Sequence, residues 1–244
     1  MGFPGGIYPF EEPWIRAALE ADPAVQQLEQ AYARDYPPVV HGQLAFDLAT
    51  GRLLRKATLP REGHLLNDLV VTPAGDVVVT DSEGSTLHRL PAGGSALEPL
   101  PVAMRWPNGI AISPDGATLY VAEVETGILR VDLASLQAAP LERPARLSLL
   151  GIDGLYARDR ELVAVHNWHF PSQVVRYRLN TTGTRIERVD VLERRDPRFV
   201  LPTTGAIVDD WFCFMANTQV NRFKSGVIVP GPPIQPIQML RTKL

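Results

Sequence analysis

Three short stretches of the chain each open with a side chain that carries a ligand oxygen. They open at Asn67, Asn108 and Asp153, and in each an apolar run leads into a turn and a second apolar run. The openings lie 41 residues apart (67 to 108) and then 45 residues apart (108 to 153). Hard cations such as calcium bind through amide and carboxylate oxygens. If the three openings meet in the folded protein, they can supply part of a cation site.

The elements that would bring these residues together are the blades of a β-propeller. A repeat of about 40–50 residues made of short strands is typical of that fold. Its innermost strands converge on a central axis, so residues that open successive blades face one another across a channel. We predict four blades and part of a fifth, at residues 64–101, 105–144, 151–197, 202–244 and 39–60.

The beginning of the chain follows a different pattern. Asp22 and Pro23 suit the cap and the first turn of a helix that runs to Asp35, and a shorter helical segment precedes it. We therefore predict a helical segment over residues 1–38 and an all-β propeller domain over 39–244. A propeller that lacks its closing strands exposes a sheet edge, which proteins usually cover. Either these helices cover that edge, or the chain is a shortened form of a longer propeller.

Composition argues against several classes of function. The net charge of −3, without a basic stripe, is not typical of nucleic-acid binding. No apolar stretch approaches the roughly 20 residues that span a bilayer. The N-terminus has no pattern of a secretion signal, so a cytoplasmic location is the default expectation. Cys213 is the single cysteine and stands in an apolar run, which predicts a buried, inert thiol. The expected partner is a small molecule.

The three stretches resemble the senescence marker protein/gluconolactonase family, which is related more distantly to the paraoxonases. The resemblance covers roughly residues 40–244 and rests on three motifs. They are Asn-Asp-Leu-Val-Val-Thr-Pro at 67–73, Pro-Asn-Gly-Ile-Ala-Ile-Ser-Pro-Asp-Gly at 107–116 and Ile-Asp-Gly-Leu at 152–155. The resemblance implies a six-bladed β-propeller, here incomplete at its N-terminus. It also implies a divalent cation, usually calcium, at the top of the channel.

The resemblance further assigns roles to individual residues. It makes Asn108 and Asp153 ligands of the cation, and Glu12 is the candidate for a further ligand, a first-blade carboxylate. Asn67 matches an asparagine that lines the channel and contacts water or substrate. Leu65 stands where members that act on sugar lactones often carry an arginine. The implied chemistry is hydrolysis of a lactone or related ester, but recognition of a sugar acid is not implied.

A cation in such a channel would polarise a lactone or ester carbonyl and lower the pKa of the attacking water. Asp153 is a candidate to accept the proton, and His64, three residues before Asn67, is another. For His64 the alternative is a solvated loop histidine. Asn67 and Asn108 equally suit caps at the start of a strand.

His166 and Asn217 are candidates to line the substrate pocket, with packing and strand-end capping as the alternatives. Asp68 and Asp81 are predicted to form turn or blade-to-blade hydrogen bonds. Two functions stay open: a metal-dependent hydrolase of lactones or related esters, and a non-catalytic propeller that binds a small molecule or protein at the channel mouth. An acid that reaches the channel, Glu12 or another, would favour the enzyme.

Overall fold

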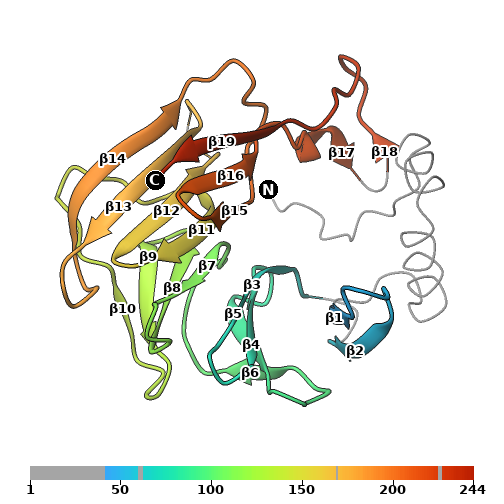
Figure 1. Ribbon diagram of the computed structural model, residues 1–244, viewed down its shortest axis with the longest axis vertical. Helices are drawn as coiled ribbons and strands as arrows, with labels where there is room; N and C mark the ends of the chain where they lie inside the picture. Colours follow the sequence, from blue (N-terminus) through green and yellow to red (C-terminus); the bar gives the residue numbers. More distant parts are fainter. Residues whose placement is uncertain (1–41, 60–62, 169, 225–226) are drawn as a thin grey trace.

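The computed structural model of the protein describes residues 42–59, 63–168, 170–224 and 227–244. In these ranges almost all regular structure is β, apart from one 3-10 turn, η1 (Val220–Arg222). The sheets stand around a common centre like the blades of a propeller (Figure 1). The all-β prediction is therefore confirmed. The predicted N-terminal helices, the boundary after residue 38 and the candidate ligand Glu12 lie outside the described residues.

Three sheets have four antiparallel strands each, paired in chain order as in a propeller blade. The first contains β3 (Leu66–Val71), β4 (Val77–Asp81), β5 (Thr86–Leu90) and β6 (Glu98–Leu100). The second contains β7 (Ile110–Ile112), β8 (Thr118–Glu123), β9 (Gly127–Asp132) and β10 (Ala138–Pro140). The third contains β11 (Ile152–Arg158), β12 (Glu161–His166), β13 (Gln173–Leu179) and β14 (Ile186–Arg194). These sheets match the blades predicted at 64–101, 105–144 and 151–197.

The remaining strands form smaller sheets. A three-stranded sheet contains β15 (Gly205–Val208), β16 (Trp211–Met215) and β19 (Met239–Lys243). Two hairpins complete the set: β1 (Gly42–Phe46) with β2 (Leu53–Thr58), and β17 (Phe223–Lys224) with β18 (Val227–Ile228). The blade predicted at 202–244 is thus a three-stranded sheet with a hairpin inserted before its last strand. The structure describes four blades, and closure into six stays a prediction.

The turns between the first and second strands explain why the first two repeats look most alike. In the first two blades Gly75 and Gly116 hold positive φ angles of 85° and 72°, a conformation that glycine adopts without steric cost. The third blade turns through two residues instead of five, and Asp159, the first of them, has a φ of 51°. Asp tolerates the left-handed region better than most residues. The first two blades thus share a turn of the same length with glycine in the same place, and the third blade has a shorter turn.

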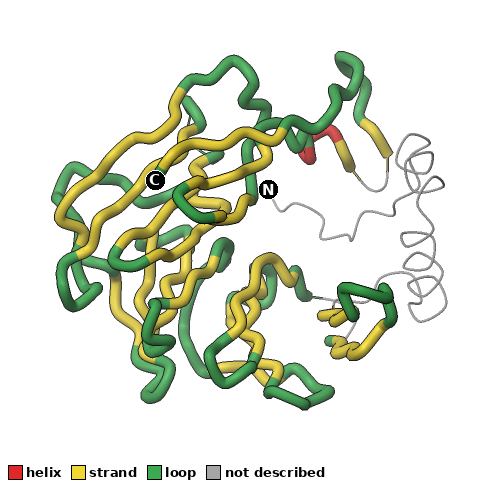
Figure 2. Tube along the Cα trace, in the orientation of Figure 1, coloured by secondary structure: helices red, strands yellow, loops and turns green. Residues whose placement is uncertain are grey.

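The inner strands β3, β7, β11 and β15 contact one another in chain order around the centre (Figures 1 and 2). Apolar clusters fill the spaces between neighbouring sheets, and the second strands are their most buried parts. Because both faces of β12 are covered, Leu162–Val165 are fully buried without alternation. This packing fixes the first residues of successive inner strands at one end of the channel.

The prediction that the Cys213 thiol is buried is wrong. On β16 the side chains of Phe212 and Phe214 are fully buried, whereas Cys213 is half-buried. Successive strand residues point to opposite faces, so the flanking phenylalanines take the core face. In the described ranges no helix is long and apolar enough to cross a membrane.

Candidate functional site

The carboxylate of Asp153 lies between two asparagine side chains. Asp153 is the second residue of β11, and the side chain of Asn108 hydrogen-bonds to it from the neighbouring blade. Nδ2 of Asn167, which follows β12, donates to Oδ2 of Asp153 at 2.5 Å and to the carbonyl of Pro202 at 2.9 Å. The structure therefore brings two of the three repeat openings, Asn108 and Asp153, into direct contact.

Local backbone geometry positions these groups. The amide of Asn108 donates to the carbonyl of Ala122 at 2.9 Å, which places Asn108 at the start of the inner strand beside β8. In β3 and β11 the pairing register shifts between Leu66 and Leu69 and between Ile152 and Leu155. Both shifts lie at the opening motifs, and such irregularities often re-aim a side chain beside an active site.

The site is electrically negative. Burial raises the pKa of Asp153, and hydrogen bonds from Asn167 and Asn108 act in the opposite direction. Burial also raises the pKa of Asp68, the amides of Leu69 and Ile110 oppose this, and the charge of Asp153 raises it further. Among the described residues no Lys or Arg lowers either pKa. Two acidic groups thus influence each other without a basic side chain between them.

The donor set fits a divalent cation. Oδ1 of Asn167 is buried and has no hydrogen-bond partner among the described residues. Nδ2 of the same amide faces two acceptors, Asp153 Oδ2 and the Pro202 carbonyl, so that Oδ1 is the atom left without a partner. A buried acceptor without a partner costs about 1–3 kcal/mol, and a hard cation would satisfy it. Candidate ligands are therefore Asp153, Asn108 and Asn167.

Asn67 and Asp68 connect the first blade to the second. Nδ2 of Asn67 donates to Oγ of Ser82 at 3.0 Å, and Ser82 Oγ donates to the carbonyl of Pro107 at 2.6 Å. Oδ2 of Asp68 accepts the amide of Ile110 at 3.2 Å, so the prediction of a blade-to-blade hydrogen bond is confirmed for Asp68. Asn67 is exposed and is tied to the segment that leads into Asn108.

His64 lies against Asp81 rather than alone in a solvated loop. Its Nδ1 atom is 2.5 Å from Oδ2 of Asp81, and Nε2 of His88 is 3.0 Å from the same oxygen. These three groups are spaced closely enough to hold a metal ion. Asp81 also accepts the amide of Gly84 at 3.0 Å, the turn hydrogen bond that the sequence predicted.

His166 and Asn217 are engaged inside their own sheets. Nε2 of His166 lies 2.6 Å from the hydroxyl of Tyr177, and its Nδ1 lies 3.1 Å from the carbonyl of Leu150. Nδ2 of Asn217 donates to the carbonyl of Pro236 at 2.8 Å, and its Oδ1 accepts the amide of Gln238 at 2.6 Å. These contacts support the alternatives given above, packing for His166 and strand-end capping for Asn217.

A pocket of about 260 Å³ opens beside Asn108. Its lining also includes Trp106, Glu123, Val124, Leu150, Gly151, Ile152 and Trp168. The Glu123 carboxylate is already engaged by Thr126 through one oxygen and by the amide of Arg105 through the other. Asn108 is therefore the polar side chain of this lining best placed to receive a ligand, and the other large side chains are apolar.

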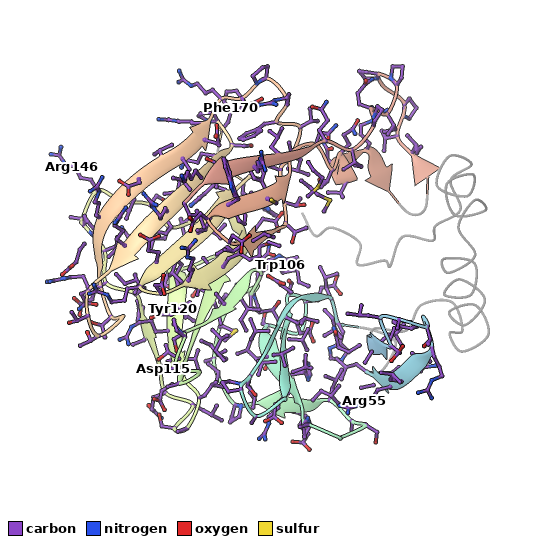
Figure 3. All side chains as sticks on the ribbon, viewed as in Figure 1. Arg55, Trp106, Asp115, Tyr120, Arg146 and Phe170 are labelled. Carbon is purple, nitrogen blue, oxygen red and sulfur yellow. The ribbon has the colours of Figure 1, made fainter. Side chains whose placement is uncertain are left out.

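Trp106, which lines this pocket, has an unusual backbone conformation. Figure 3 places it near the centre of the molecule, beside β7 and β3. Its φ of 48° is in the left-handed region, an uncommon conformation for a bulky residue. Strain of this kind costs about 1–3 kcal/mol and concentrates at ligand sites. Sequence reasoning did not single out Trp106, although it directly precedes the Pro-Asn-Gly motif.

Residues 39–197 match the family described as the SMP-30/Gluconolactonase/LRE-like region. The chain belongs to this family. The resemblance inferred from the three motifs is thereby confirmed. No curated protein matches the chain.

Solved structures share the fold of this family member at low sequence identity. A gluconolactonase from Xanthomonas campestris is 18% identical, with a TM-score of 0.53, over 73% of this chain and 65% of that one. A calcium-binding protein, regucalcin, from Agrobacterium tumefaciens is 21% identical, with a TM-score of 0.52, over 74% and 64%. A chain of a nidogen/laminin complex is 14% identical, with a TM-score of 0.56, over 72% of this chain and 66% of that one. The chain thus spans less than two thirds of the length of these structures.

Proposed function

We propose that the protein is a divalent-cation-dependent hydrolase of lactones or related esters, with calcium as the expected ion. The observation that carries this proposal is the Asp153 carboxylate, which lies between Asn108 and Asn167, together with the apolar pocket that Asn108 lines. Membership of the SMP-30/Gluconolactonase/LRE-like family supports it. When bound, the cation would polarise the substrate carbonyl and lower the pKa of water.

The side chains of the site have separate tasks in this proposal. Asp153, Asn108 and Oδ1 of Asn167 would hold the ion, and Nδ2 of Asn167 would also fix the Asp153 carboxylate. Asp153 is also the candidate acceptor for the proton of the attacking water. His64, which lies against Asp81, would serve as a base only if it left this contact.

The pocket supports a particular kind of substrate. Trp106, Trp168, Val124 and Leu150 offer apolar contact area beside Asn108, and the lining supplies no basic side chain. A carboxylated sugar would lack a cationic partner there, which agrees with Leu65 in place of an arginine. We therefore expect lactones or esters with an aliphatic or aromatic substituent.

A hydrolysis screen tests this function. Alkyl-substituted lactones and aryl esters are offered to the wild type, to Asp153→Asn and to the control Asp115→Asn, each in calcium and in chelator. Asp115 lies in an exposed turn, where it bonds Ser113. Turnover is expected to vanish on chelation and to fall by at least about 100-fold in Asp153→Asn, because a cation contributes several kcal/mol. The control variant is expected to keep wild-type turnover.

Two outcomes of the screen would count against the enzyme. Equal rates in calcium and chelator would contradict the metal-dependent hydrolase. Calcium-dependent binding of the same compounds without turnover would favour the second candidate function, a non-catalytic propeller, which the same pocket also supports.

A further inference from the structure

Three metal-ligating side chains converge within the first four-stranded blade. His64 precedes β3, Asp81 ends β4 and His88 lies on β5. Nδ1 of His64 and Nε2 of His88 lie 2.5 and 3.0 Å from one atom, Oδ2 of Asp81. The three ligand atoms all lie within 4.8 Å of one another. None of the three residues belongs to the Asn108–Asp153 site.

The Asp81 carboxylate is oriented like a ligand that binds through one oxygen. Its side chain is fully buried, and Oδ1 accepts the amides of Leu65 at 2.8 Å and Gly84 at 3.0 Å. Outer hydrogen bonds of this kind orient metal-bound carboxylates. The surroundings are tight on this side, since a Cβ atom on Gly84 would lie 2.3 Å from Oδ2. Only Oδ2 is left to face the two imidazoles.

We propose that His64, Asp81 and His88 form a second metal site, which binds a zinc-like transition-metal ion. Two imidazole nitrogens and one carboxylate oxygen suit zinc, cobalt or nickel, whereas calcium prefers oxygen ligands alone. The His64 side chain is 21% exposed, against 5% for His88, so the ion enters and keeps a water ligand on the His64 side.

The hydrogen bonds of the metal-free state indicate what zinc affinity to expect. Without the ion, each imidazole donates its N–H to Oδ2 of Asp81; with the ion, each proton moves to the other ring nitrogen. For His88 that nitrogen is Nδ1, which is buried and has no partner among the described residues. A missing outer-shell hydrogen bond typically costs 10–100-fold in metal affinity. We therefore expect micromolar rather than nanomolar zinc binding.

The role of this ion is to stabilise the hydrogen bonds that lead from Asp81 to the segment before Asn108. Ser82 follows Asp81 and joins Asn67 to the carbonyl of Pro107, the residue before Asn108. An ion that holds Asp81 thus also holds the hydrogen bonds at the edge of the channel. This role does not depend on hydrolysis.

Metal titration of the full chain tests the second site. After chelator treatment the protein is titrated with cobalt, followed by visible absorption, and with zinc, followed by calorimetry. We expect one ion per chain and visible cobalt bands that zinc abolishes. His64→Gln and His88→Gln are each expected to weaken binding at least about tenfold, while Asp153→Asn keeps it. Circular dichroism monitors folding.

Several results would overturn this proposal. They are the absence of zinc binding by the wild type, retention of wild-type affinity in His64→Gln, and loss of zinc binding in Asp153→Asn. Because His64 is partly exposed, its variant is expected to fold, and it tests the site even if His88→Gln does not fold. Zinc binding together with a failed hydrolysis screen would leave the second site standing and contradict only the proposed enzyme.

Discussion

Asn167 is the side chain that connects Asp153 to the last blade. Its Nδ2 bonds both Asp153 and the carbonyl of Pro202, and its Oδ1 is a buried acceptor without a described partner. Asn167→Ala removes both the orienting bond and a candidate ligand. We expect calcium affinity to fall about 10–100-fold in calorimetry. Asn221→Ala, an exposed asparagine, is the control; unchanged affinity in Asn167→Ala would refute the assignment.

Trp106 should decide which substrates are preferred. It lines the apolar pocket beside Asn108, so Trp106→Ala removes contact area for an apolar substituent. Each lost methylene contact is worth roughly 1–3 kcal/mol in discrimination. We expect kcat/KM for a long-chain lactone to fall about tenfold or more, mainly through KM, and less for an unsubstituted lactone. Equal losses for both substrates would speak against a specificity role.

Sequence reasoning reached Asn108 and Asp153 because they open repeats whose spacing is visible in the chain. The sequence did not indicate Asn167 and His88, because their neighbours in space depend on how the strands pair. The register of β4 with β5 places Thr86 opposite Asp81, and His88, two residues on, then shares the face of Asp81. Such a neighbour depends on the exact pairing, which alternation of apolar residues does not determine.

At the scale of elements, neighbouring inner strands approach closely at glycine. A Cβ atom on Gly109 would lie 2.3 Å from the carbonyl oxygen of Asp153 and 2.6 Å from the amide of Leu155. Gly109→Ala must therefore push β7 from β11, which we expect to cost about 1–3 kcal/mol in urea unfolding and to weaken calcium binding. Gly93→Ala, whose Cβ would meet nothing within 4 Å, carries only the cost of its positive φ. Equal calcium affinities in these two variants would show that the close approach of β7 and β11 at Gly109 does not position the calcium site.

The outer strands of the third blade carry a charge cluster that makes stability depend on pH. Burial opposes ionisation of Asp190, but hydrogen bonds from Arg188, Arg176 and Arg178 prevail and lower its pKa from 3.8 to about 2. A lowered folded-state pKa stabilises the protein above the unfolded value, and that stability is lost as pH falls from about 4 to about 2.

Asp190→Asn should therefore lower the free energy of unfolding by about 1 kcal/mol at pH 7. The variant should also lose part of the decline in stability between pH 4 and pH 2, because it has no carboxylate to protonate there. Urea unfolding across this range measures both effects. Identical acid-side slopes for variant and wild type would contradict the role of Asp190.

The last sheet shows where strand prediction fails. The sequence between β16 and β19 is rich in proline from residue 230 to residue 236, and proline cannot donate a ladder hydrogen bond. The chain leaves the sheet after Met215 and returns as β19 at Met239, beyond this proline-rich stretch. The sequence predicted a blade at 202–244, but it could not indicate which later segment pairs with β16.

At the scale of the whole molecule, the repeats become blades whose inner strands follow one another around a centre. This order lets residues 45 positions apart, Asn108 and Asp153, share a hydrogen bond. The period and the motifs were sufficient to predict the all-β propeller and the family. They were not sufficient for the apolar pocket, because Trp106, Leu150 and Trp168 meet only when two blades pack together.

The proposed hydrolase depends on a divalent cation that binds between the second and third blades at Asn108 and Asp153. Calorimetric titration of chelator-treated protein with calcium tests it most directly, with Asp153→Asn as the paired variant. We expect one calcium ion per chain for the wild type and an affinity at least about 100-fold weaker for Asp153→Asn. Absence of calcium binding by the wild type, or equal affinity in the variant, would contradict it.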